Sequence, residues 1–154
     1  MKLFLKILIL LLFVGCSNVN SVTKKPPFIN LIAQQDKYSL ILKKYFYKNF
    51  TTYDTKLPTI TLKTKLLFTS NSTLSNDGNK SLTIIKGTVK FEIFNSLNSK
   101  IIRSGQISTS INTGSVSSLY SVDENNNFAK ERISQYLASK LYQKTLLSFS
   151  HSEN

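Results

Sequence analysis

The residue with the most distinctive chemistry in this sequence is its only cysteine, Cys16. A thiolate can be alkylated, can be oxidised or can bind a metal. Cys16 comes at the end of an uninterrupted apolar run over residues 7–14, and Lys2 and Lys6 precede that run. The residue types alone offer three interpretations of Cys16: a small core residue, a reactive thiol, or a point of covalent attachment.

The segment before Cys16 favours attachment, because a positive start followed by an apolar run is the pattern of a secretory signal. The run is shorter than the roughly 20 residues that a membrane span needs. The stretch Phe13-Val14-Gly15-Cys16 resembles the lipobox of bacterial lipoproteins, in which the cysteine is acylated and becomes the first residue of the mature chain. We therefore expect a signal peptide over 1–15 and lipidation at Cys16. The alternative is a signal-anchor helix with an incidental cysteine.

The remainder of the chain is long enough for one domain, and a domain of this size buries enough surface to fold without a metal or a disulfide. Residues 17–27 are polar, hold two lysines and end in Pro26-Pro27, a composition typical of an extended tether. The expected organisation is a lipidated N-terminus and tether over 16–27, a single domain over 28–149 and a polar tail over 150–154.

Hydrophobic periodicity predicts two helices. Asp36 can cap the first and Asn49 can end it, with one face formed by Tyr38, Ile41, Leu42 and Tyr45. The second is expected from about Asn126, after a loop over 112–127, and to give way to polar residues from Ser148. Its apolar stripe is Ala129, Ile133, Tyr136, Leu137 and Leu141.

Between these helices the period changes to two, which predicts strands. A short strand is expected over 28–33 and three long strands follow at about 59–70, 84–93 and 100–112. The inward residues of the third long strand are expected to be Ile101, Ile107 and Ile111. This order predicts an α+β fold: a two-layer sandwich with two helices packed on one face of a mainly antiparallel sheet of about four strands.

Residues suited to catalysis are scarce. His151 is the only histidine and lies three residues from the end of the chain. The eight acidic residues form no close pair except Asp123-Glu124, which we interpret as charges at a helix start. The glycines are scattered and do not form a phosphate-binding loop. We therefore predict no catalytic site, no metal site and no cofactor.

Positive charge is the more informative feature, with 20 basic against 8 acidic residues and a formal net charge of +12. Excess positive charge favours anionic partners. In an exported lipoprotein we expect lipid headgroups as the partner, and no nucleic acid. Strand parity places four lysines on the uncovered sheet face: Lys63, Lys65, Lys86 and Lys90. They are candidates for binding an anion, and the alternative is that they only keep that face soluble.

The order of these elements resembles the LptE (rare lipoprotein B) family of lipopolysaccharide-assembly lipoproteins. The stretch "NNNFAKERISQYLASKLYQKTLLSF" is similar to the last helix of that family, with Ala129 and Arg132 ahead of a Leu-rich stripe. The stretch "IIRSGQISTSINTGSVSSLYSVDEN" is similar to the preceding strand and its tyrosine-containing loop. One departure is Ser17-Asn18, where relatives often carry Gly and an aromatic residue.

This resemblance implies a protein anchored at the periplasmic face of the outer membrane, where it assembles with a β-barrel translocon (LptD-like) and binds lipopolysaccharide. The four lysines are then candidate lipopolysaccharide-binding residues, and Ser17 after the cysteine is compatible with outer-membrane sorting. The nearest alternative is an auxiliary lipoprotein of a lipid-transporting ABC system. A third is an enzyme whose site no motif reveals.

Overall fold

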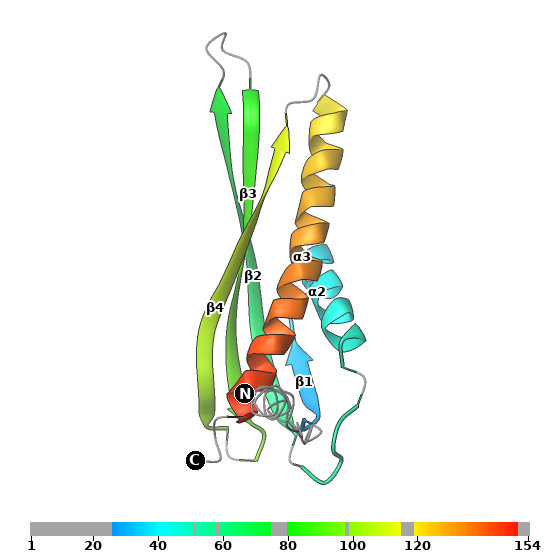
Figure 1. The fold of residues 1–154 in the computed structure, drawn as a ribbon, viewed down its shortest axis with the longest axis vertical. Helices are drawn as coiled ribbons and strands as arrows, with labels where there is room; N and C mark the ends of the chain where they lie inside the picture. The colour runs from blue at the N-terminus through cyan, green and yellow to red at the C-terminus, as the bar shows by residue number, and fades with distance from the viewer. Residues whose placement is uncertain are drawn as a thin grey trace, which may run out of the picture.

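A four-stranded sheet forms one layer of the protein (Figure 1). The computed structural model describes residues 26–50, 52–57, 59–74, 80–97, 99–114 and 119–150. The strands are β1 (Ile29–Ile32), β2 (Ile60–Leu74), β3 (Lys80–Asn95) and β4 (Ile101–Gly114), in the spatial order β1-β2-β3-β4. β1 runs parallel to β2, and the other neighbours are antiparallel. The predicted meander of three long strands is confirmed.

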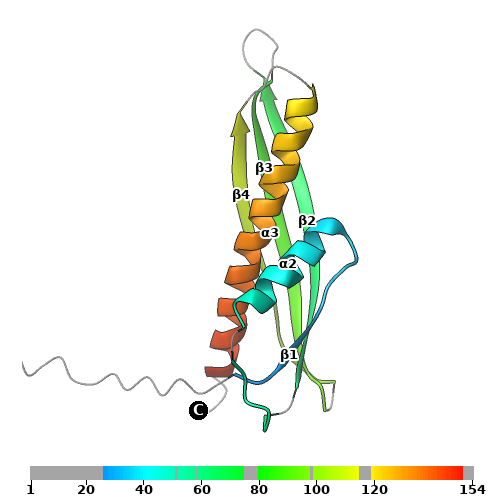
Figure 2. The ribbon, with the colours of Figure 1, turned by 90° about the vertical axis from the view of Figure 1, so that its right-hand side faces the viewer.

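Two helices, α2 (Lys37–Lys48) and α3 (Leu119–Ser150), cover one face of this sheet and leave the other uncovered (Figures 1 and 2). α3 has 32 residues, and at a rise of 1.5 Å per residue it is about 48 Å long. It follows the long strands over most of their length. The predicted two-layer α+β sandwich is confirmed. Neither of the two helices combines the length and the apolar character that a membrane span requires.

Asp36 caps α2, as predicted from the sequence. Its Oδ1 accepts hydrogen bonds from the backbone N–H groups of Tyr38 and Ser39, each at 3.0 Å. Partial burial acts to raise the pKa of Asp36, but the hydrogen bonds that its carboxylate accepts at the start of α2 outweigh it, so the pKa lies below its ordinary value. Asn49 is the C-terminal cap, also as predicted.

The core lies between the inner face of the sheet and the helices. β2 and β3 contribute alternate residues, as their predicted period of two requires, and the buried ones include Ile60, Leu62, Leu66, Ile85, Val89, Phe91 and Ile93. The fully buried residues of α2 are Ser39, Leu42 and Phe46. Of the predicted stripe, Leu42 is buried, and Tyr38 and Tyr45 are partly buried against the core. α2 packs against α3 more than against the sheet, which centres its buried side on Leu42 and Phe46.

Gly87 is a position where α3 approaches the sheet closely. A Cβ atom at this residue would overlap Cγ2 of Ile133, and it would lie 3.1 Å from Cε1 of Phe68 and 3.3 Å from Cδ1 of Leu137. Ile133 and Leu137 are fully buried. The absence of a side chain at Gly87 is therefore what lets the helix lie directly on β3.

One predicted core residue of β4 is wrong: Ile101 is 53% exposed. The pairing of β3 with β4 shifts between Ile93 and Phe94, since Ile93 pairs with Arg103 whereas Phe94 pairs with Ile101. This extra residue in β4 reverses which side chains face inward. Arg103 takes the inward place, where its guanidinium donates a hydrogen bond to Ser148 Oγ at 3.3 Å.

α3 is also longer than its apolar pattern predicts. It begins at Leu119, so the predicted loop over 112–127 is wrong in its second half, and Asp123 and Glu124 lie beyond the first turn. At the other end, Ser148 is buried within the helix and is not part of a polar tail. Its hydroxyl donates to the carbonyl oxygen of Lys144 at 2.9 Å, which satisfies its polar group inside the helix.

The stripe of α3 is largely as predicted, with Ala129, Ile133, Leu137 and Leu141 buried. Tyr136 is the exception, because half of it is exposed. It lies on the solvent side of the helix, where Lys140 approaches its ring.

Candidate functional site

The uncovered face of the sheet carries the four lysines that the sequence singles out. Lys63, Lys65, Lys86 and Lys90 are all exposed, and each alternates along its strand with residues of the core. Because both helices lie on the opposite face, nothing in the described part of the chain covers these side chains. The parity of the strands was therefore sufficient to place them.

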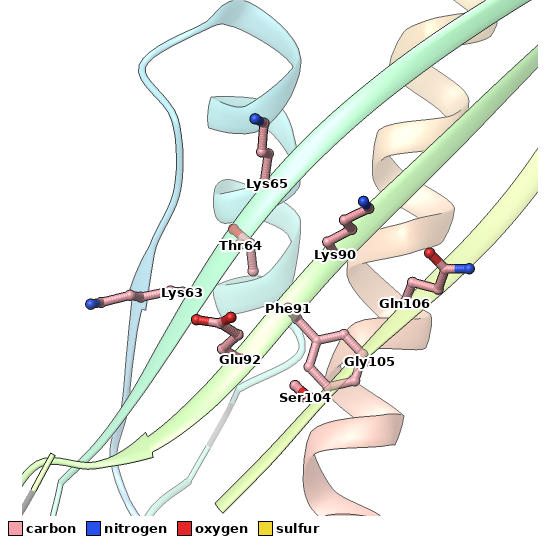
Figure 3. Close-up of a pocket in the computed structure, with 9 residues that line it drawn as sticks. All are labelled: Lys63, Thr64, Lys65, Lys90, Phe91, Glu92, Ser104, Gly105 and Gln106. Atoms are coloured by element: carbon pink, nitrogen blue, oxygen red, sulfur yellow. The ribbon is translucent and has the colours of Figure 1, made fainter. Parts of the chain in front are cut away.

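The strand register brings three of these lysines together. Lys65 pairs directly with Lys90, and Lys63 pairs directly with Glu92. They border a hollow of about 610 Å³ that spans β2, β3 and β4 (Figure 3). Its lining consists of Lys63, Thr64, Lys65, Lys90, Phe91, Glu92, Ser104, Gly105 and Gln106. We call Lys63, Lys65 and Lys90 the lysine cluster.

The charges in the lysine cluster are only partly balanced. Like charges that face each other directly across two strands destabilise a sheet, and Lys65 and Lys90 are such a pair. Within the described part of the chain no carboxylate forms an ion pair with either of them. Lys63 extends away from the other two in Figure 3, and its Nζ lies 4.6 Å from the centre of the Phe94 ring. The pair of Lys65 and Lys90 is therefore the part of the cluster best suited to an anion.

Lys86 lies apart from this cluster. It pairs with Thr69 on β2 and with Ser110 on β4. Four residues separate it from Lys90 along β3, which at about 3.3 Å per residue places it roughly 13 Å away. The structure therefore brings together three of the four predicted residues, and Lys86 does not border the hollow.

Four polar residues of the lining, Thr64, Glu92, Ser104 and Gln106, were not among the predicted site residues. Glu92 could have been predicted from the sequence, because it lies two residues after Lys90 on the same strand and so points to the same face. Ser104 and Gln106 come from β4, and their place beside Lys90 and Glu92 depends on the register of β3 against β4. That register includes the shift near Ile93, which no pattern in the sequence indicates.

The lining of this hollow is suited to binding an anion. Lysine Nζ atoms supply charge, while the Ser104 hydroxyl and the Gln106 amide can donate hydrogen bonds. The lining contains neither histidine nor cysteine. Among the described residues, no three of the types His, Cys, Asp and Glu gather as metal ligands. Cys16 and His151 lie outside the described residues.

Comparison with known proteins gives similarity at the level of structure. No family model matches the chain, and no curated protein matches it. Rare lipoprotein B from Shewanella oneidensis is similar with a TM-score of 0.64 at 9% identity, over 84% of this chain and 99% of that one.

Two further solved structures are similar. A minor lipoprotein from Acinetobacter baumannii has a TM-score of 0.54 at 18% identity and is covered over 96% of its length by 84% of this chain. A proposed lipoprotein from Caulobacter crescentus has a TM-score of 0.59 at 12% identity, over 82% of this chain and 93% of that one. The chain thus has the fold of bacterial lipoproteins that include rare lipoprotein B, the fold implied by the resemblance in its sequence.

Proposed function

We propose that this protein is an outer-membrane lipoprotein, anchored through Cys16 at the periplasmic face, that assembles with an LptD-like β-barrel translocon and binds lipopolysaccharide during its delivery to the cell surface. The observation that carries the proposal is the similarity to rare lipoprotein B over 99% of that chain. The lipobox before Cys16 supports the anchor. The role is one of assembly and ligand binding, without catalysis.

The lysine cluster supports the ligand-binding part of this proposal. Lipopolysaccharide is a phosphorylated glycolipid, and lysines bind phosphate oxygens as point charges. Lys65 and Lys90 face each other across β2 and β3 on the side of the sheet away from the helices. A phosphate between them would offset their mutual repulsion, and a large ligand can approach because the face is uncovered.

The partner is tested by co-purification from membranes in a mild detergent. We expect a large β-barrel protein to be recovered with the full-length chain and identified by mass spectrometry. Recovery of an inner-membrane ATPase complex in its place would refute the proposal and support the ABC-system alternative.

Ligand binding is tested by titrating lipopolysaccharide into the double variant Lys65→Gln, Lys90→Gln. An exposed charge contact contributes about 0.2–1 kcal/mol, so the loss of two should weaken binding about 2- to 30-fold. The effect should diminish at high salt, because screening already weakens the interaction of the unmodified protein. Retention of full affinity would assign these lysines to solubility alone.

Two controls separate a bound anion from general charge. The variant Lys44→Gln, Lys48→Gln removes the same charge from α2 and should bind as the unmodified protein does. Lys86→Gln removes a lysine from the same strand and face as Lys90, at a distance from the hollow. It should weaken lipopolysaccharide binding less than Lys90→Gln does. Equal losses of affinity would contradict a binding site at the hollow.

A further inference from the structure

The solvent side of α3 carries an unusual row of side chains. Residues three or four apart lie beside each other on a helix, and such steps connect two aromatic residues, three basic residues and a leucine. Because a step of four exceeds one turn of 3.6 residues by about 40°, the row winds gradually around α3. We call the set Phe128, Arg132, Tyr136, Lys140, Lys144 and Leu147 the aromatic-basic stripe.

The apolar members of this stripe are strongly exposed. Phe128 is 60% exposed, Tyr136 50% and Leu147 56%. The basic residues stay close to the rings: Cζ of Arg132 lies 5.7 Å from the Phe128 ring centre, and Nζ of Lys140 lies 5.5 Å from that of Tyr136. The stripe therefore offers apolar surface and positive charge to the same partner.

The charge of the stripe is not balanced by its own helix. From Arg132 to its end at Ser150, α3 contains basic residues and no acidic residue. The preceding acid, Glu131, pairs with Lys37 of α2 at 2.8 Å. The side of α3 that faces α2 carries other residues, among them Asn127, which accepts a hydrogen bond from Tyr38, and Ser139, which bonds to the cap residue Asn49. Among the described residues Arg132, Lys140 and Lys144 form no ion pair, so the stripe is complementary to a negatively charged surface.

We propose that the aromatic-basic stripe docks on the surface of an anionic lipid bilayer. Aromatic rings are favoured at the depth of lipid headgroups, and lysine and arginine reach the phosphates while their stems lie on apolar surface. The inference is independent of the β-barrel partner and of lipopolysaccharide binding.

The length of chain before the described domain is compatible with this placement. Residues 16–25 can span at most about 35 Å when fully extended. The start of the described chain at Pro26 and the C-terminal end of α3 lie at the same end of the molecule (Figures 1 and 2). An anchor at Cys16 would hold the stripe near the bilayer and raise its effective concentration there.

A tryptophan probe tests the docking directly, because the sequence contains no tryptophan. The processed protein carrying Phe128→Trp is reconstituted into vesicles of phosphatidylcholine with phosphatidylglycerol, whose acyl chains are brominated. The reference is Leu97→Trp, at an 80% exposed position in the turn between β3 and β4. We expect a blue-shifted emission and about twofold stronger quenching for the probe at 128. Equal quenching at the two positions would overturn the proposal.

Matched charge variants then separate the stripe from net charge. The triple change Arg132→Gln, Lys140→Gln, Lys144→Gln should reduce the quenching of the probe at 128 to the level of the reference. The control removes three charges from the lysine cluster by Lys63→Gln, Lys65→Gln, Lys90→Gln and should leave the quenching unchanged. Loss of quenching in both variants, or in neither, would refute docking through the stripe. Far-UV circular dichroism checks that each variant is folded.

The same variants distinguish this inference from the proposed function. Lipopolysaccharide titration reports on the lysine cluster, and vesicle quenching reports on the stripe. A stripe variant that loses quenching while it retains lipopolysaccharide affinity and its co-purified partner supports two separate surfaces. Failure of the β-barrel or lipopolysaccharide part of the proposed function leaves the vesicle result unaffected.

Discussion

Replacement of Gly87 by alanine tests how tightly α3 is packed on the sheet. The added methyl group would overlap Cγ2 of Ile133 and would lie within 3.3 Å of Phe68 and Leu137. Ile133 cannot rotate away easily, because a β-branched side chain in a helix has essentially one χ1 rotamer. Either the helix must shift or the methyl group must be compressed.

The size of the effect follows from two opposing contributions. An extra methyl group in a packed core costs about 1–3 kcal/mol. Alanine in place of glycine also restricts the unfolded chain, which stabilises by about 0.4–1 kcal/mol. For Gly87→Ala we therefore expect a net loss of about 1–2 kcal/mol in the free energy of unfolding, measured by urea titration with circular dichroism at an unchanged m-value.

A second substitution gives this prediction a specific check. Ile133→Leu keeps the side-chain volume but removes the branch at Cβ that carries Cγ2. Combined with Gly87→Ala, it should recover part of the loss, so the two changes should be non-additive. Gly105→Ala is the comparator, because a Cβ there meets only the ring of Phe91, at 3.0 Å and beyond, and should cost less. An unchanged or increased stability of Gly87→Ala would refute the close approach of α3.

Two further substitutions test hydrogen bonds described above. Asp36→Ala removes the cap of α2 and should cost about 1 kcal/mol in thermal unfolding near neutral pH. Because the pKa of Asp36 is lowered in the folded protein, this contribution is present above the ordinary carboxyl value of 3.8 and is lost as the pH falls through the lower folded value; a difference that persists in stronger acid would contradict this. Tyr47→Phe leaves the buried N–H of Leu31 without the hydroxyl that accepts its hydrogen bond at 2.9 Å, and we expect a loss of about 1–3 kcal/mol in urea titration. No loss would mean that another acceptor replaces the hydroxyl.

The parts of the fold that could be predicted are those in which burial follows a simple period. β2 and β3 alternate strictly because one face packs on the helices, and Asp36 marks the start of α2 because its carboxylate fits the free N–H groups there. Ile101 could not be placed, because the register shift beside Ile93 depends on how β4 meets β3. The first two turns of α3 were missed because Ser, Asn and acidic residues there leave no apolar stripe to read.

The sequence was sufficient to predict on which face of the sheet the candidate site lies, but not which residues are adjacent there. Parity along each strand placed Lys65 and Lys90 on the uncovered side. Which residues of the neighbouring strands lie beside Lys90 depends on strand register, and the register placed Lys65 on one side of it and Gln106 on the other. The register of β3 against β4 depends on how the two strands fit together, so it cannot be predicted from the sequence pattern of either strand alone.

The parallel pairing of β1 with β2 has a consequence for the order in which the protein folds. The hairpins of β2, β3 and β4 close short loops, whereas Ile29 must find Ile60 across the whole of α2. Loops of that length close more slowly and at a higher entropic cost. We therefore expect Ile29 and Leu31, which are fully buried in the native state, to pack later than the hairpins form. β1 then stays accessible at least until β2 has formed.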